Sequence, residues 1–309
     1  GGLGLFNYEG IRVRNFSVES RAGVLTLIPF SEPGGPATQA DRNGEERKIR
    51  DFRTRHFNKQ DTLWAAEVDG IRAFGQDSEL VQVMKEIARR AARLRAEAEL
   101  TFEYHRLNAL QGLVKNPSNG STIYNWYTEF GITPAAEINF DLDNATPAKG
   151  ALKKKCQETV QSMEDSIGGL VPGSISVEAV VDNTFWNALT THKEVMEAYM
   201  HAGDIASQRG IDVTEFMWGG ILWRRYRGGS GVAVPTGKAL IYIAGIDDMF
   251  EEYASPAETL DFVNTPGMPT YYRMIPDRDR NAWIKVELKS NPMFVCRRPK
   301  ALRVGKKTA

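Results

Sequence analysis

The feature that most constrains the fold is one long amphipathic segment, residues 77–113. Apolar side chains recur along it at every third or fourth position, which is the spacing of one helix face. They are Leu80, Met84, Ile87, Ala91, Leu94 and Ala98. The opposite face carries Lys85, Arg89, Arg90, Arg93 and Glu97. The pattern predicts one continuous helix of about 55 Å, which is longer than a small domain is wide.

The ends of this helix are marked by residues that start and stop helices. Asp77 or Ser78 can cap the first turn, and Gly112 followed by Pro117 ends the periodicity. A coiled coil is one interpretation, but alanine and arginine positions interrupt a clean heptad after Leu94. The preferred interpretation is a long spine that lies across a sheet.

The N-terminal region predicts an extended arm without a core of its own. Residues 9–30 alternate apolar and polar side chains, and Ser20 to Gly23 predicts the turn of a β-hairpin. Residues 31–44 are rich in proline and glycine and predict a loop, and residues 46–58 return as a basic, extended segment. Because a lone two-stranded ribbon is marginal in water, we expect the arm to lie on something else.

The rest of the chain mixes helices and strands, so the fold class predicted from the pattern is α+β. Residues 116–120 predict a turn and residues 121–130 a strand or hairpin arm. Helices are predicted at 151–167, ended by Gly168 and Gly169, and at 184–200, capped by Asp182. Strands are predicted at residues 175–181, 216–226, 238–244 and 283–288.

Charge is balanced overall but uneven along the chain. Lys plus Arg and Asp plus Glu number 39 each, so the net basic signature of a nucleic-acid-binding protein is absent. Residues 42–59 and the C-terminal tail from Arg297 are basic, whereas Asp247 to Asp261 is acidic. Blocks of opposite sign can pair between copies of the chain, or each block can be only a solvated face.

No residue pattern in the sequence predicts catalysis, a cofactor or a metal. The segment from Gly231 to Lys238 resembles a phosphate loop only loosely, because Ala239 replaces the Ser or Thr that holds magnesium and a strand follows. The four histidines form no ligand pair, and two cysteines are too few for the usual zinc site. Residues 218–226 could stack bases through their aromatics, but a β-hairpin with a Gly-Gly bend is the preferred interpretation. No apolar run is long enough to span a membrane, and no secretory signal is visible.

Several segments match one known protein family in order and spacing. Asp69 to Gly75 leads into the long helix, which ends in Leu100 to Gly112. Further matching segments are residues 124–131, 185–195, 216–226, 250–257, 263–267 and 290–292. Together these segments resemble the lambda-type (capsid protein E) family of tailed-phage major capsid proteins, over about residues 5–304.

The resemblance implies the capsid fold first seen in a Hong Kong coliphage. On that pattern residues 1–65 form an N-terminal arm and extended loop, and residues 66–145 a peripheral domain with the spine helix. Residues 146–261 form an axial domain, and residues 262–309 return to the peripheral domain. Family members usually have more sequence before the position of Gly1.

We therefore expect a non-enzymatic shell protein that forms hexamers and pentamers around double-stranded DNA. Implied partners are further copies of the chain, packaged DNA, and decoration, scaffold and portal proteins. Expected locations are the virion and, during assembly, the host cytoplasm. Bacterial nanocompartment shells share the fold, and a basic-helix nucleic-acid-binding protein using Lys85 to Arg95 is a second alternative. The residues expected at contacts between subunits are Arg47, Lys48, Arg50, Arg53, Arg55, Asp247, Asp248, Glu251 and Glu252.

Overall fold

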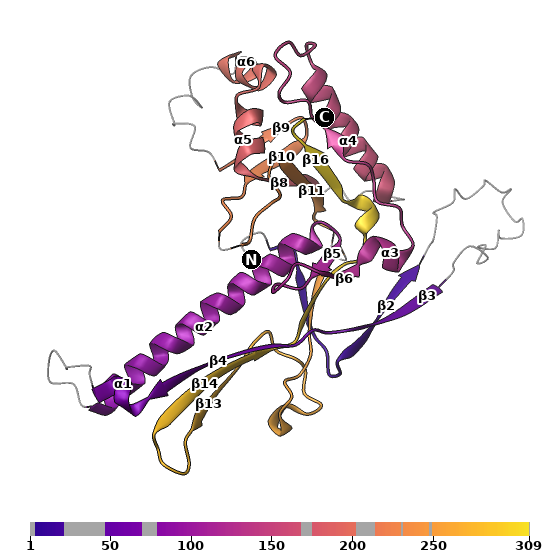
Figure 1. Ribbon diagram of the computed structural model, residues 1–309. Coiled ribbons are helices and arrows are strands. Elements are labelled where there is room, and N and C mark those ends of the chain that lie inside the picture. The colour runs from indigo at the N-terminus through magenta and orange to yellow at the C-terminus, as the bar shows by residue number, and fades with distance from the viewer. Residues whose placement is uncertain are drawn as a thin grey trace, which may run out of the picture. The chain divides into compact units, whose positions relative to one another are not determined.

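The computed structural model describes residues 4–21, 47–69, 79–167, 175–201, 214–229, 231–246 and 249–308 (Figure 1). The chain divides into two compact units, each built from segments far apart in sequence. Unit 1 comprises Gly1–Phe16, Asp51–Arg106 and Glu251–Val295, and unit 2 comprises Ser17–Arg50, Leu107–Phe250 and Cys296–Ala309. The expected division into arm, peripheral and axial parts stays a prediction.

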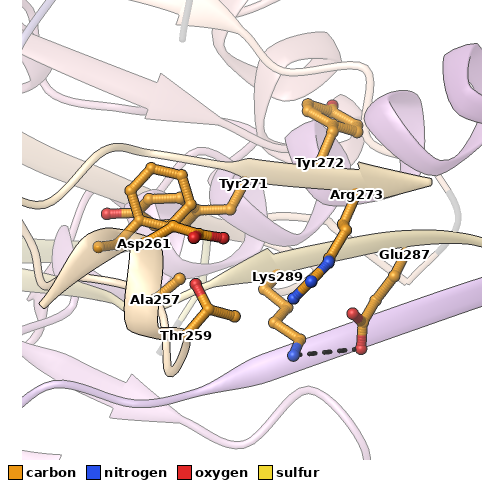
Figure 2. Close-up of a pocket in the computed structure, with 9 residues that line it drawn as sticks. Ala257, Thr259, Asp261, Tyr271, Tyr272, Arg273, Glu287 and Lys289 are labelled. Carbon is orange, nitrogen blue, oxygen red and sulfur yellow. Dashed lines mark ion pairs between the residues drawn. The ribbon is translucent and has the colours of Figure 1, made fainter. Parts of the chain in front are cut away.

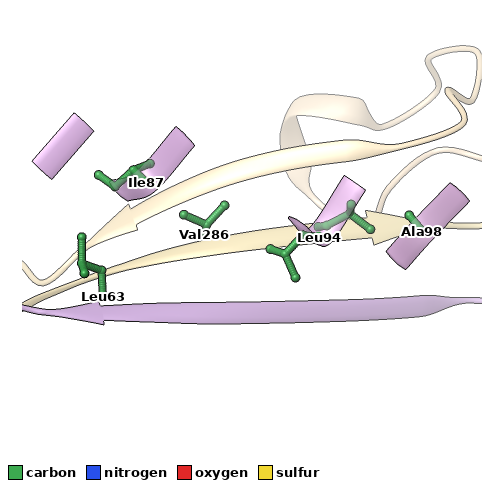
Figure 3. Close-up of a cluster of buried hydrophobic side chains, with 6 residues drawn as sticks. Leu63, Ile87, Leu94, Ala98 and Val286 are labelled. Carbon is green, nitrogen blue, oxygen red and sulfur yellow. The ribbon is translucent and has the colours of Figure 1, made fainter. Parts of the chain in front are cut away.

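The long helix is confirmed as one uninterrupted element, α2 (Glu79–Ala109). It packs on a three-stranded antiparallel sheet in the order β13 (Tyr271–Pro276), β14 (Trp283–Ser290) and β4 (Phe57–Trp64). Six buried side chains join helix and sheet (Figure 3): Leu63, Ile87, Leu94, Ala98, Val286 and Leu288. A short helix, α1 (Ala65–Asp69), follows β4.

The prediction of the apolar face is wrong for one residue, Met84. Met84 is 52% exposed, whereas Ile87 is 4% exposed. At 100° per residue Met84 lies about 60° around the helix from Ile87, beyond the partly buried Ala91, so it reaches the rim of the stripe. The side chain of Leu80 lies outside the described residues.

The first strand of the hairpin predicted at residues 9–30 differs from its prediction, while the second, at residues 24–28, lies outside the described residues. Its first part is β1 (Asn7–Gly10), which pairs in parallel with β12 (Phe250–Ala254), and β12 also pairs with β15 (Pro292–Cys296). The second part is β2 (Asn15–Arg21), which runs through the Ser20–Arg21 position of the expected turn. Residues 22–46, with the rest of that turn and the predicted loop, lie outside the described residues.

The partner of β2 is β3 (Arg47–Arg53), so the two strands form a ribbon. The extended segment predicted at residues 46–58 is thereby confirmed. The ribbon's apolar residues face inward at its base: the rings of Phe16 and Tyr253 stack at 4.4 Å, and Phe16 and Phe52 lie 5.9 Å apart. The ribbon therefore has an anchored base in unit 1, which the sequence pattern did not predict.

Unit 2 contains a six-stranded mixed sheet. Its order is β7 (Ile138–Asn139), β16 (Arg303–Lys306), β11 (Lys238–Ala244), β8 (Ser176–Val181), β10 (Ile221–Arg225) and β9 (Glu215–Trp218). The strands predicted at 175–181 and 238–244 are confirmed, and so is the Gly-Gly hairpin, β9–β10. Its Gly219 approaches Cys156 so closely that a Cβ would lie 2.4 Å from the cysteine Cβ.

The helices of unit 2 follow the predictions with one break. Helix α4 (Ala151–Ile167) is confirmed, and Asp182 caps α5 (Asn183–Thr190) by accepting bonds from the amides of Thr184 and Phe185. The predicted helix 184–200 is divided, however: α5 ends at Thr190 and α6 (Lys193–His201) begins three residues later. The reason is local, because the amide of His192 bonds to the carbonyl of Leu189, which tightens the last turn.

The segment after the spine is also partly different from its prediction. The turn at residues 116–120 joins β5 (Leu113–Lys115) to β6 (Thr122–Asn125). Residues Trp126–Phe130 form helix α3 instead of continuing the strand, because the side chain of Asn125 caps it by accepting from the amide of Tyr127. The segment at Gly231 leads into strand β11, which agrees with the rejection of a phosphate loop.

Candidate intersubunit surfaces

The five basic residues expected at contacts between subunits all follow β2 in sequence, on β3 and the turn after it. Arg47 and Lys48 belong to β3, and only their backbone is described. The guanidinium carbon of Arg50 lies 5.6 Å from the centre of the Phe130 ring, within unit 2. Arg53 and Arg55 are exposed, and the amide of Arg55 donates to the carbonyl of Pro292 at 3.2 Å. Of the five, Arg53 and Arg55 are therefore the two whose described side chains are exposed in the single subunit.

The acidic residues expected opposite them are not on one open surface. Glu251 and Glu252 are 9% and 6% exposed, because β12 is the central strand of its sheet. The hydroxyl of Tyr253 donates to Glu251. Asp247 and Asp248 lie outside the described residues. Among the described acidic residues of that stretch, only Glu258 and Asp261 are therefore exposed. Their pairing with a neighbour stays a prediction.

Glu252 instead belongs to an ion pair inside unit 1 that the sequence reasoning missed. The side chain of Arg106, from the end of α2, donates to the Glu252 carboxylate at 2.8 Å. The rings of Phe102 and Phe294 lie 5.8 and 5.5 Å from the guanidinium carbon. Burial raises the pKa of nearby Tyr8 to about 12, with further increases from Tyr271 and Glu252. The pair joins helix to sheet and is not available to a neighbour.

The sheet under the spine has one covered face and one open face. Along β14, Val286 and Leu288 are buried toward α2, while the alternating residues Lys285, Glu287 and Lys289 are partly exposed. Beside the open-face residues Glu287 and Lys289 stand Arg273 and Tyr271 of the edge strand β13. This open face is a polar surface with a free sheet edge beside it, which is a geometry suited to contact with another chain.

A pocket of about 160 Å³ lies at one end of this open face (Figure 2). One wall is the loop Ala257 to Phe262, which includes the 3-10 helix η1 (Leu260–Phe262), and the other wall is β13 and β14. Figure 2 shows Arg273, Glu287 and Lys289 pointing to the same side of the sheet. Lys289 pairs with Glu287 at 3.3 Å.

Exposed apolar side chains lie on the loop beside the pocket and on β13. Leu260 is 94% exposed and Val263 59% exposed on the loop. On β13, Tyr272 and Met274 are 45% and 50% exposed and stand opposite Leu288 and Val286, on the α2 side of the sheet. Sequence reasoning missed these residues, because an apolar residue in a sequence indicates a core position by default. The signal that could have found them is the Asn-Thr-Pro-Gly run after Val263, which places the segment in a surface loop.

Histidines and cysteines do not form a reactive centre among the residues that the structure describes, and no group there could hold a metal ion. His105 and His192 are 8% and 5% exposed. Burial lowers the pKa of His105 to about 4 and also lowers that of His192. Cys156 and Cys296 are buried free thiols, and burial raises the pKa of each to about 12. Thiols held neutral in this way are unreactive. In the described part of the chain, no helix is long and apolar enough to cross a membrane.

Sequence comparison relates the chain to phage capsid proteins. A family model described as phage major capsid protein E matches residues 1–307. The major capsid protein of Pseudomonas phage KPP10 is 31% identical, with 84% of this chain and 79% of that protein aligned. The major capsid protein of Salmonella phage Felix O1 is 23% identical, with 97% and 89% aligned.

Structure comparison agrees on the fold. The mature capsid of bacteriophage PhiM1 matches with a TM-score of 0.54 at 12% identity, covering 98% of this chain and 85% of that one. The capsid of a native GTA particle matches with a TM-score of 0.55 at 10% identity, covering 99% and 89%. At these identities the matches establish the fold alone. The expected α+β tailed-phage capsid fold is confirmed.

Proposed function

The chain belongs to the phage major capsid protein E family, and we propose that its copies form hexamers and pentamers that close an icosahedral shell around double-stranded DNA. Its function is that of a major capsid protein, and its place is the capsid of a phage virion. The observation that carries this conclusion is the family match over nearly the whole chain, together with the 31% identical capsid protein.

The surfaces of the single subunit support self-assembly. The β2–β3 ribbon packs at its base through Phe16, and β13 offers an unpaired edge among the described strands. Adding a strand or an arm to a neighbour's sheet edge supplies many backbone hydrogen bonds. Heterologous contacts that close after five or six copies would build the rings.

The finer parts of the proposal concern chemistry and partners. The subunit acts without catalysis, cofactor or metal. The packaged DNA contacts it without sequence preference through exposed basic side chains, which makes the contact sensitive to salt. Portal, scaffold and decoration proteins are further partners, and assembly takes place in the host cytoplasm.

Particle formation by the purified chain tests the proposal. Cryo-electron microscopy should show closed shells with five- and six-fold capsomers. Nucleic acid released from particles made in the presence of phage packaging proteins should be double-stranded DNA. Particles that enclose a protein cargo would instead indicate a nanocompartment. A chain that stays monomeric and shifts DNA in gels would indicate the basic-helix alternative.

The N-terminal arm provides a second test. We expect residues 20–58 to contact a neighbouring subunit more than their own. Deleting residues 31–44 should leave a folded monomer, judged by circular dichroism, that assembles poorly. Normal shells from the shortened chain would show that this loop is dispensable.

Charge on the ribbon distinguishes a neighbouring subunit from DNA as its partner. Replacing Arg50, Arg53 and Arg55 together by Glu should abolish the assembly of empty particles if these residues meet a neighbour. A triple replacement by Lys keeps the charge and is the matched control. Normal empty shells that fail only when DNA enters would assign the three arginines to the DNA-facing surface.

A further inference from the structure

We propose that the pocket between η1 and β13 is a docking surface for a second copy of this chain, held by Asp261 of one copy pairing with Arg273 of the other around an inserted Leu260. This inference rests on the proposed shell function and assigns one of its contacts. It concerns unit 1 alone, where all the lining residues lie.

Two opposite charges face the pocket from different walls. Asp261 comes from the loop and Arg273 from β13, and both are exposed. Neither is in an ion pair with any part of the chain that the structure describes. Lys289 and Glu287 in the same pocket, by contrast, already form an ion pair with each other. The carboxylate and the guanidinium are therefore available to partners of opposite sign from outside the subunit.

A third polar group in the same wall is also unsatisfied. The hydroxyl oxygen of Thr259 is buried and has no hydrogen-bond partner within the described residues. Buried polar atoms are almost always bonded in finished structures. A neighbour's polar group entering the pocket would satisfy it.

The projecting side chain beside the pocket is rigidly presented. Leu260 is 94% exposed on η1, while the next-but-one residue, Phe262, packs its ring 4.7 Å from that of Tyr271. The hydroxyl of Tyr271 in turn accepts from the amide of Met268 at 2.7 Å. The loop that carries Leu260 is thus fixed to the sheet on the C-terminal side of the projection. A large apolar side chain held in water by a fixed loop marks an interaction site.

The surface is complementary to itself, which identifies the occupant. It carries a projecting leucine next to a hollow of about 160 Å³ whose lining combines the charged Asp261 and Arg273 with the rings of Phe262 and Tyr271. It also carries one free negative and one free positive charge. Two copies can therefore exchange both Asp261–Arg273 pairs, or a ring of copies can repeat one pair, as symmetric assemblies require. A partner of uniform charge would leave one of the two charges unpaired.

Charge reversal of the full chain tests the proposal. Asp261→Arg and Arg273→Asp should each lower the yield of sedimenting particles at least tenfold, because every such contact then opposes like charges. An equimolar mixture of the two variants should recover a large part of the yield, since each supplies the charge that the other lost. Only pairing between copies predicts this recovery. Asp261→Glu and Arg273→Lys keep the charges and should assemble normally.

Folding is followed by circular dichroism and thermal melting of the unassembled chains. Leu260→Asp gives a second reading, because this side chain contacts little in its own subunit and its loss should stop assembly without lowering the melting temperature. Normal assembly of both single reversals, or no recovery on mixing, would overturn the proposed contact while wild-type shells leave the proposed function intact. Failure of the wild-type chain itself to form shells would instead overturn the proposed function.

Discussion

The six-stranded sheet of unit 2 and the sheet under α2 in unit 1 differ in how many of their faces are covered. In unit 2, β8 and β11 are buried almost without interruption, from Val177 to Val181 and from Ala239 to Ile243. In unit 1, β14 alternates between buried and partly exposed residues, because only α2 covers it. A sheet covered on both faces is complete within its own chain, whereas a sheet covered on one face keeps a surface for another chain. The comparison locates docking capacity in unit 1.

The largest expected effect is the difference in stability lost when one tryptophan of each sheet is replaced. Trp223 of unit 2 is fully buried, and its ring lies 5.5 Å from Phe140 and 5.7 Å from Phe185. Trp223→Ala should cost about 3–5 kcal/mol of unfolding free energy in a denaturant titration of the unassembled chain. Trp64 of unit 1 is 50% exposed, so Trp64→Ala should cost about 1 kcal/mol or less. Equal losses would contradict the contrast.

The second effect tests whether unit 1 depends on its spine. Ala91→Pro should cost about 3 kcal/mol or more, because the ring removes a backbone hydrogen bond and clashes with the preceding turn. Ala91→Gly leaves the hydrogen bond in place and should cost about 1 kcal/mol. Thermal melting of the unassembled chain measures both changes. A proline variant no less stable than the glycine variant would show that α2 bends freely there.

Acid should weaken unit 1 through His105. Burial lowers the pKa of His105 from 6.5 to about 4, so the folded state holds the neutral ring. The unfolding free energy that neutral His105 contributes is fully present above pH 6.5. It is lost as the pH falls toward 4, and the loss reaches about 2 kcal/mol at pH 5. Denaturant titrations between pH 5 and 7 measure this loss. His105→Phe, whose ring can stack on Phe294 as the imidazole does, should flatten the pH dependence. An unchanged slope would assign the acid sensitivity elsewhere.

The smallest effect concerns surface ion pairs, which should not distinguish the units. Lys59 of β4 pairs with Glu97 of α2 at 2.8 Å, and Lys238 pairs with Glu137 in unit 2. Each pair is partly exposed, so Lys59→Ala and Lys238→Ala should each cost about 0.2–1 kcal/mol. The cost should shrink in about 1 M salt. A loss of several kcal/mol at either position would show that the pair matters more than its exposure indicates.

Local signals predicted the elements of unit 2 well. Residues 238–244 form a continuous apolar run that becomes β11, and Asp182 stands where an N-cap must stand before α5. In both cases the information lies within a few neighbouring residues. The break between α5 and α6 was missed because His192 ends the first helix without the glycine or proline that usually marks a stop.

Long-range pairing could not be predicted from the sequence pattern. β1 joins β12, which is more than two hundred residues away, and alternation along β1 does not identify that partner. The acidic stretch near Glu252 predicted a surface, but β12 runs through the middle of a sheet and buries it beside Arg106. Leu260 is the reverse case, because its apolar side chain suggests a buried position and only the folded loop shows that it is exposed.

The order in which unit 1 receives its segments has a consequence for synthesis. Leu94 of α2 packs beside Val286 of β14, which leaves the ribosome about 190 residues later. At the usual rate of about 5–20 residues per second, the apolar stripe of the finished helix waits roughly 10–40 s for its central strand. During that interval the apolar face of the helix is exposed on the nascent chain, where chaperones can bind it. Because the open face and the Leu260 loop arrive with the same late segment, the docking surface proposed above would form only when the fold of the subunit is nearly complete, and unfinished chains would then lack it.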